Sequence, residues 1–289
     1  MYIKPIIIAF VVSISAENAA ASGEELLSRG EYILRIGGCV HCHTADGGEQ
    51  LAGGRPLETP FGTFYTPNIT PHDTAGIGAW SESQFRDALH SGVAPDGESY
   101  YPAFPYTSYT RIVTEDVRAL WAYLKSLPAS SQPNREHELP WYLQFRIAAQ
   151  IWQYLFFTAG EYRERPQQSV SWNRGAYIAE ALAHCGECHT PRSIFGATQA
   201  DLAYAGTAHG PDDEQVPNIT PHPKTGIGDW TRDELRQFLE FGELPDGEYA
   251  AGAMEPVSEE LTRLTAADRE ALVDYLQALT PVDNAVGGD

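Results

Sequence analysis

The sequence is short of basic residues and of sulfur-containing side chains. It has 19 Lys and Arg against 39 Asp and Glu, which gives a formal net charge of −20. A surface this negative repels phosphate backbones, so we expect no nucleic-acid partner and favour cationic patches on other proteins. Hydrophobic residues make up 43% of the chain, which excludes a disordered or fibrous protein. The four cysteines are too few for a disulfide scaffold, so their positions matter more than their number.

Long hydrophobic runs are also missing, and only the N-terminus comes near one. Lys4 precedes an apolar stretch over 6–14, and three alanines at 19–21 follow it. This order is typical of a secretory signal peptide, and the apolar core is too short to span a bilayer. We therefore expect residues 1–21 to be a signal peptide cleaved near Ala21, and the mature protein to be periplasmic. An uncleaved N-terminal membrane anchor is the alternative.

The rest of the chain contains an internal repeat. Residues 67–98 align with 217–248 without a gap, and just over half of the aligned positions are identical. Matching segments flank this block in the same order, with 29–33 resembling 174–178 upstream and 117–127 resembling 269–279 downstream. Self-similarity of this kind indicates a duplicated domain. We predict a first domain over 22–127, a linker over 128–170 and a second domain over 171–289.

Each half predicts three helices joined by long loops. The loops are rich in Gly and Pro and show little alternation of polar and apolar residues, so they would need a large buried ligand to pack against. The pattern predicts an all-α fold of two small helical bundles. In the linker, residues 141–157 predict one amphipathic helix. Its apolar face would pack between the two domains, or dock on a partner subunit or a membrane surface.

All four cysteines lie in two copies of one motif, Cys-x-x-Cys-His. The copies consist of Cys39, Cys42 and His43, and of Cys185, Cys188 and His189. This spacing is the attachment pattern for c-type haem, in which the thiols add to two vinyl groups and the histidine binds the iron. A four-cysteine zinc site normally brings its pairs within a few tens of residues. A redox pair or two disulfide loops would not explain the repeated histidine. We therefore predict two covalently bound haem c groups.

Around these motifs the chain resembles diheme class I cytochromes c, which serve as cytochrome subunits and electron acceptors of periplasmic dehydrogenases. The resemblance covers nearly all of the predicted mature chain and includes the segments PNITP, GIG-x-W, PDG and YPAFPYTSYT. It implies two tandem class I cytochrome c domains, each with loops wrapped round one covalent haem, and electron transfer as the function. The implied partners are a dehydrogenase and an electron acceptor, either another cytochrome or a terminal oxidase.

The distal iron ligand is expected to differ between the halves. Methionine or histidine normally takes this position, from the loop before the last helix. Apart from Met1, the chain has one methionine, Met254, which precedes the last helix of the second half. We assign it to the second haem. The aligned loop of the first half has Phe104, and similar cytochromes with a later methionine have it where this chain has Ile112. No methionine is therefore assigned to the first haem.

Histidines are the next candidates for the first haem. His72 has a twin in His222, which favours a shared loop function, and His41 lies inside the attachment loop. His90 is aligned with Glu240 and is therefore unique to the first half. We take His90 as the candidate distal ligand. An open site, or an unusual ligand such as Tyr or Lys, is the alternative.

Repeated polar residues are expected to surround the haems. Trp80 and Trp230 occupy matching positions, as do Asn68 and Asn218. Their N–H groups would hydrogen-bond haem propionates, which are costly to bury unpaired, although simple packing also explains the repetition. Arg55 would pair with a propionate in the first half only.

Three functions are compatible with these patterns. The one we favour is a periplasmic electron carrier between a dehydrogenase and an acceptor. The second is a haem enzyme whose open first haem binds a peroxide or a sulfur oxyanion, but the sequence identifies no catalytic acid or base. The third is a fixed cytochrome subunit of a membrane-associated dehydrogenase or oxidase complex, docked through 141–157.

Overall fold

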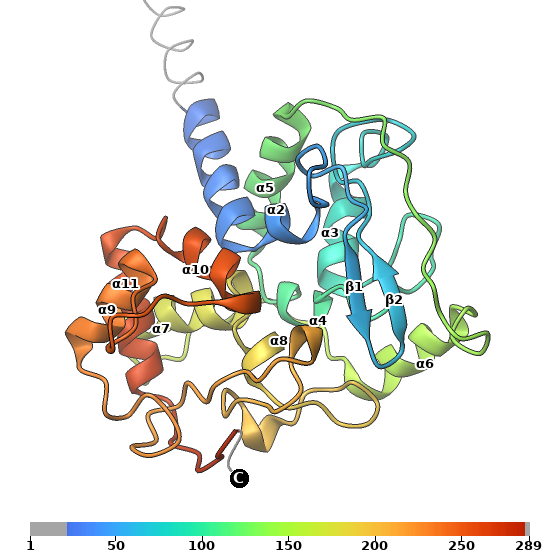
Figure 1. Cartoon of the computed structure of the whole chain (residues 1–289). Coiled ribbons are helices and arrows are strands. Elements are labelled where there is room, and N and C mark those ends of the chain that lie inside the picture. The colour runs from blue at the N-terminus through green and yellow to red at the C-terminus, as the bar shows by residue number, and fades with distance from the viewer. Residues whose placement is uncertain (1–21, 287–289) are drawn as a thin grey trace, which may run out of the picture.

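The two halves of the repeat lie against each other in the computed structural model, which describes residues 22–286 (Figure 1). The predicted signal peptide lies outside the described residues. Within 22–286, no helix has the length and the apolar character needed to cross a bilayer. The described chain is mostly helical, which agrees with the expected cytochrome fold class in its main feature.

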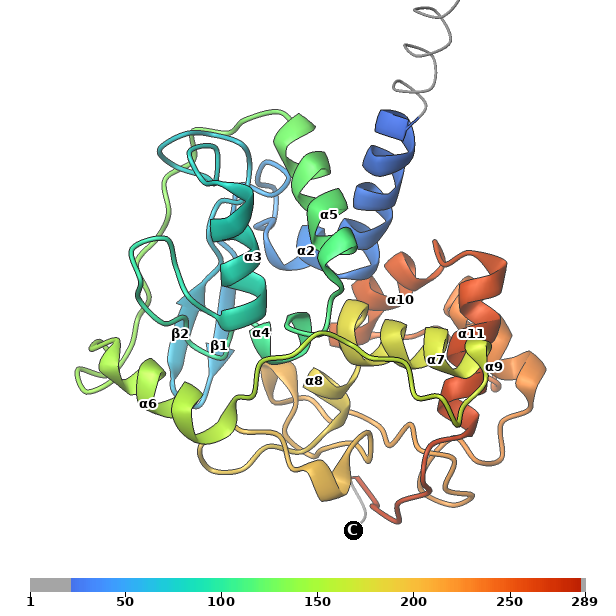
Figure 2. The same cartoon turned by 180° about the vertical axis from the view of Figure 1, so that it is seen from behind.

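The first half is built from one long N-terminal helix over 22–36 and four further helices. These are α2 (Cys39–Cys42), α3 (Glu82–Ser91), α4 (Tyr106–Tyr109) and α5 (Thr114–Ser126). The helix over 22–36 runs beside α5 in both views (Figures 1 and 2). Gly30 makes this approach possible, because a Cβ atom there would lie 2.1 Å from the carbonyl oxygen of Ala119. The two helices therefore touch at a point where only glycine fits.

A short hairpin interrupts the helical pattern of the first half. Strands β1 (Pro56–Thr59) and β2 (Gly62–Tyr65) pair antiparallel, and the backbone of Thr63 exchanges hydrogen bonds with that of Glu138 at the outer edge. The expectation of an all-α fold was wrong in this detail. Four-residue strands are too short for polar and apolar alternation to appear in the sequence. The other edge of β2 is bridged by Glu138, which lies far along the chain.

The linker contains one helix, α6 (Ile147–Phe156), which is shorter than predicted. Residues 141–146 form turns, because Leu143 N–H bonds the carbonyl of Pro140 and the side chain of Gln144 bonds the carbonyl of Leu139. The helix lies at the edge of the molecule, beyond the hairpin (Figure 1). It contacts both halves, since Ala149 is buried beside Phe64 and Tyr101, and Trp152 bonds the carbonyl of Phe195.

The second half repeats the helical order of the first. Its helices are α7 (Val170–Tyr177), the π-helix η1 (Ile178–Leu182), α8 (Gly186–His189), α9 (Arg232–Phe241), α10 (Glu255–Leu261) and α11 (Ala266–Gln277), with 3-10 turns η2 (Ala200–Leu202), η3 (Pro211–Asp213) and η4 (Gly252–Met254). Capping boxes are present at Ser81, before α3, and at Thr231, before α9. Gly175 of α7 faces Ala271 of α11 as Gly30 faces Ala119, with a Cβ-to-oxygen distance of 1.9 Å.

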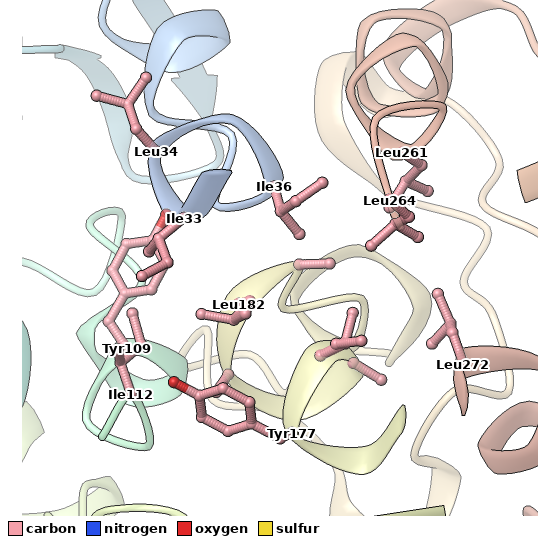
Figure 3. Packing of buried hydrophobic residues seen from close by; sticks show 14 of the residues in the cluster. Ile33, Leu34, Ile36, Tyr109, Ile112, Tyr177, Leu182, Leu261, Leu264 and Leu272 are labelled. Carbon is pink, nitrogen blue, oxygen red and sulfur yellow. The ribbon is translucent and has the colours of Figure 1, made fainter. Parts of the chain in front are cut away.

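One cluster of buried side chains connects the two halves. Ile33 and Ile36 come from the N-terminal helix, Leu182 from η1, and Leu261 and Leu264 from around the end of α10. Figure 3 shows Leu182 between the side chains of the first half and those of the second. Because apolar burial is the main stabilising contribution, the halves share one core and are held in a fixed arrangement.

Candidate haem sites

The first Cys-x-x-Cys-His motif forms α2 and the turn after it. Its helical geometry places Cys39 and Cys42 one turn apart, and His43 N–H bonds the carbonyl of Cys39 at 2.9 Å. The ring of His43 donates from Nδ1 to the carbonyl of Pro67 at 2.7 Å. This bond fixes the tautomer and leaves Nε2 free to bind a metal. Burial lowers the pKa of His43, so the ring is kept in the neutral form that binds iron.

The second motif repeats this arrangement on α8. His189 donates from Nδ1 to the carbonyl of Pro217 at 2.8 Å, and burial lowers its pKa in the same way. Pro67 and Pro217 begin the two copies of the PNIT segment. The repeated segment therefore supplies the carbonyl that orients each histidine. Sequence reasoning identified the repetition but not this reason for it.

The cysteines are unpaired in both motifs. Burial raises the pKa of Cys39 and of Cys185 to about 12, so these side chains are neutral thiols at neutral pH. Among residues 22–286, no three His, Cys, Asp or Glu side chains are grouped as a metal site requires. The donor set of each half, two thiols and one imidazole with a free Nε2, fits a covalent haem.

Met254 ends η4 and immediately precedes α10, partly buried against the shared core. Its loop is tied to the segment that leads to Pro217, because Ala253 N–H donates to the carboxylate of Glu214 at 3.1 Å. The loop that would supply the distal ligand is therefore joined to the segment that orients the proximal histidine. The assignment of Met254 to the second haem remains a prediction that this arrangement supports.

In the first half, the two positions considered for a distal methionine carry hydrocarbon side chains. Phe104 lies among aromatic rings, with centroids 5.5 Å from Tyr100 and 5.7 Å from Tyr109. Ile112 is 2% exposed and belongs to the shared core. Neither side chain has an atom that can bind iron, so these two positions supply no distal ligand.

His90 is directed at other protein groups. Its Nε2 donates to the carbonyl of Ile112 at 2.8 Å, and its Nδ1 lies 3.9 Å from the carboxylate of Glu161. The 2.8 Å bond commits Nε2 to a backbone carbonyl, so this nitrogen is not presented to an iron in this structure. The prediction that His90 is the distal ligand has no support in this geometry. Helix periodicity places a side chain on a face, but it does not show which carbonyl that side chain meets.

The two repeated asparagines hold the chain rather than a ligand. Asn68 accepts from Thr70 through Oδ1 and donates through Nδ2 to the carbonyls of Ser130 and Gln132. Asn218 bonds Thr220 and the carbonyl of Val282 in the same way. The expectation that these amides bind propionates was wrong, because their polar atoms are used to fasten the segment after each last helix.

The remaining residues singled out around the two motifs are an arginine, a histidine and two tryptophans. Arg55 donates to the carbonyl of His41, inside the first attachment loop, at 3.2 Å. His72 accepts from the backbone N–H of Ala75 at 3.1 Å, which confirms the predicted loop function. The indole N–H groups of Trp80 and Trp230 have no hydrogen-bond partner within residues 22–286. They remain predicted donors to haem propionates.

Comparisons with known proteins agree with this site. The family model for cytochrome c matches residues 27–128. The chain is 37% identical over 270 residues to the gluconate 2-dehydrogenase cytochrome c subunit of Pantoea cypripedii, which covers 91% of this chain and 61% of that protein. It is 36% identical over 263 residues to the fructose dehydrogenase cytochrome subunit of Gluconobacter japonicus, which covers 90% of this chain and 54% of that protein.

A third relative matches over almost its whole length. The diheme cytochrome c-type protein of Cereibacter sphaeroides is 37% identical over 273 residues, which cover 92% of this chain and 89% of that protein. Covalent haem attachment and electron transport thus define the class of protein. The chain belongs to the cytochrome c family.

Proposed function

We propose that this protein is an exported diheme c-type cytochrome that carries electrons from a dehydrogenase to a downstream acceptor. The observation that carries the proposal is the duplicated site, in which each half has a thiol pair and a neutral histidine oriented by a proline carbonyl. Each haem supplies a one-electron iron couple when bound. The dehydrogenase is proposed because the gluconate and fructose relatives are named as cytochrome subunits of such enzymes.

The residues have distinct functions in this proposal. Cys39 and Cys42 attach the first haem and His43 binds its iron. Cys185 and Cys188 would attach the second haem, and His189 and Met254 would bind its iron.

Haem content and redox stoichiometry test the proposal directly. The protein is expressed with a signal peptide in a host that matures cytochromes c, and its intact mass is measured. We expect the mass of the mature chain plus two haems, and uptake of two electrons in a reductive titration. The double variant Cys185→Ala/Cys188→Ala is expected to retain one haem. A wild-type protein with one haem or none contradicts the proposal.

An exposed apolar surface supports a second candidate, the fixed subunit of a complex. The residues before α6 and along it leave large side chains in solvent, namely Trp141, Tyr142, Phe145, Ile147, Ile151, Tyr154 and Leu155. We call this set the linker patch. Patches of this composition are typical of protein interfaces. The chain spans about 60% of the length of the gluconate relative.

The two candidates differ in how the protein meets its partner. A diffusing carrier with a charge of −20 is expected to react more slowly as salt screens its attraction to a cationic partner. A subunit fixed through the linker patch is expected to co-purify with its dehydrogenase at high salt and to lose it in the variant Trp141→Ser/Tyr154→Ser. The matched control is Tyr249→Ser, which removes an exposed aromatic side chain in the second half.

A further inference from the structure

The two attachment segments meet at a polar contact that neither motif predicts. The phenol of Tyr109, in α4, donates to the carbonyl of Gly37 at 2.8 Å and lies 3.1 Å from Nε2 of His184. Gly37 is two residues before Cys39, and His184 immediately precedes Cys185. The rings of Tyr109 and His184 also pack edge to face, with centroids 5.2 Å apart. A short chain of contacts thus joins the two haem-bearing segments.

The surroundings of this contact are buried and firmly held. Tyr109 is 8% exposed, and a Cβ atom on Gly37 would lie 3.8 Å from the carbonyl oxygen of Leu182, in van der Waals contact across the halves. Glu187, inside the second attachment loop, accepts from Thr107 at 2.8 Å and from Ser108 at 2.5 Å, both in α4. The second attachment loop is therefore fastened to the helix that carries Tyr109.

The backbone of His184 is strained. Its φ is +37°, in the left-handed region that side chains disfavour. In the first half, the residue before Cys39 is Gly38, and its backbone is also left-handed, with a φ of +66°. The repeat therefore needs a left-handed residue here. The second half uses histidine where glycine would be free of strain, and such strain is concentrated at functional positions.

The contact also breaks the internal symmetry of the molecule. The position in the second half that corresponds to Tyr109 is Leu261, and the position in the first half that corresponds to His184 is Gly38. The duplicated fold is thus stable with an apolar residue and a glycine at these places. The structural needs of the fold therefore do not explain why the first half has Tyr109 and the second half has His184 at these positions.

We propose that Tyr109 and His184 form the bridge through which electrons pass between the two halves. This inference depends on the proposed function, because it requires a haem on each attachment segment. With both haems bound, the step would transfer one electron from one iron couple to the other, and no proton or covalent bond would be transferred. Both residues are positioning residues. Their contacts provide a bonded path from Gly37, just before the first attachment motif, to Cys185, the first cysteine of the second motif.

The test measures electron redistribution inside the protein. Pulse radiolysis delivers less than one electron per molecule to the purified diheme protein, and the subsequent unimolecular change is followed by the absorbance of the two haems. Tyr109→Phe removes the hydroxyl and keeps the ring. His184→Gly removes the imidazole and relieves the backbone strain. We expect each variant to slow the redistribution several-fold, with haem content and both reduction potentials unchanged.

A matched control separates the bridge from a general effect of losing a hydroxyl. Tyr65→Phe removes a phenol that bonds Glu138 at 2.9 Å, a bond between two residues that both lie outside 37–43 and 184–189, and its rate is expected to equal that of the wild type. Wild-type rates in both Tyr109→Phe and His184→Gly, with potentials unchanged, would overturn the proposal. If the wild-type protein carries fewer than two haems, the proposed function itself fails, and intact mass shows this before any kinetic measurement.

Discussion

The phenol of Tyr32, in the first half, donates a 2.6 Å hydrogen bond to Asp268, in the second half. The reverse bond is also present, because Tyr177 of the second half donates to Asp116 of the first half at 2.6 Å. Each aspartate is further bound by an arginine of its own half, Asp268 by Arg174 and Asp116 by Arg29. The repeated sequence Arg-Gly-x-Tyr thus supplies an arginine within its half and a tyrosine across the boundary.

We expect Tyr32→Phe and Tyr177→Phe each to lower the free energy of unfolding by about 1.5–3 kcal/mol, the range for hydrogen bonds to charged groups. The aspartates stay paired with their arginines, so neither variant leaves a carboxylate unpaired. Urea unfolding of the haem-loaded protein measures the effect. Tyr142→Phe, an exposed residue of the linker patch, is the control and should match the wild type. Stability within error of wild type in both variants would show that the reciprocal bonds do not join the halves.

The two helix-contact glycines give a second prediction. A Cβ atom at Gly30 or Gly175 would lie about 2 Å from a backbone oxygen of α5 or α11, and a backbone atom cannot move aside as a side chain can. We expect Gly30→Ala and Gly175→Ala each to destabilise the protein by about 3 kcal/mol, at the upper end of overpacking effects. Thermal unfolding measures this. Gly23→Ala is the control, since no atom lies within 4 Å of its Cβ position and alanine favours the helix.

Acid sensitivity follows from Asp268. Burial opposes ionisation of this carboxylate, but the hydrogen bonds from Arg174 and Tyr32 prevail and hold its pKa below the ordinary value. The unfolded chain therefore binds a proton more readily than the folded protein. The resulting stabilisation is complete above about pH 4, the ordinary range for aspartate, and is lost as the pH falls through the lower folded-state pKa.

The measurement is the free energy of unfolding against pH for the wild type and for Asp268→Asn. We expect the variant to be less stable at neutral pH and to lose less stability than the wild type below about pH 4. Asp201→Asn, at an exposed position, is the matched control and should follow the wild-type curve. Parallel curves for wild type and Asp268→Asn would show that the bonds from Arg174 and Tyr32 to Asp268 do not cause the loss of stability at low pH.

Much of the site was predictable because short spacings encode it. The Cys-x-x-Cys-His spacing, the repeat and the caps at Ser81 and Thr231 are local, so they could be found without the fold. The partners of Asn68 and His90 could not, because the carbonyls of Ser130 and Ile112 are brought to them by tertiary packing. The bridge residue His184 left one signal that was missed, a glycine replaced by histidine at a matching position of the repeat.

The last prediction concerns the asymmetry between the haems. Met254 is the one methionine of the chain besides Met1, so at most one iron in the predicted mature monomer has a thioether ligand. A thioether stabilises ferrous iron, and the second haem is therefore expected to have the higher reduction potential. The first haem, with Phe104 and Ile112 at the aligned positions, is expected to bind carbon monoxide or cyanide more readily.

Three variants test this asymmetry by absorbance and ligand titration. Met254→Ala should abolish the methionine–iron charge-transfer band and lower the potential of the second haem, with the first haem unchanged. Because His90 is bound to the carbonyl of Ile112, His90→Ala should leave the spectrum and ligand affinity of the first haem as in the wild type. Ile112→Met should convert the first haem to methionine ligation, weaken its carbon monoxide binding and raise its potential. Two methionine-ligated haems in the wild-type monomer would contradict the assignment, and a changed first haem in His90→Ala would restore that histidine as the ligand.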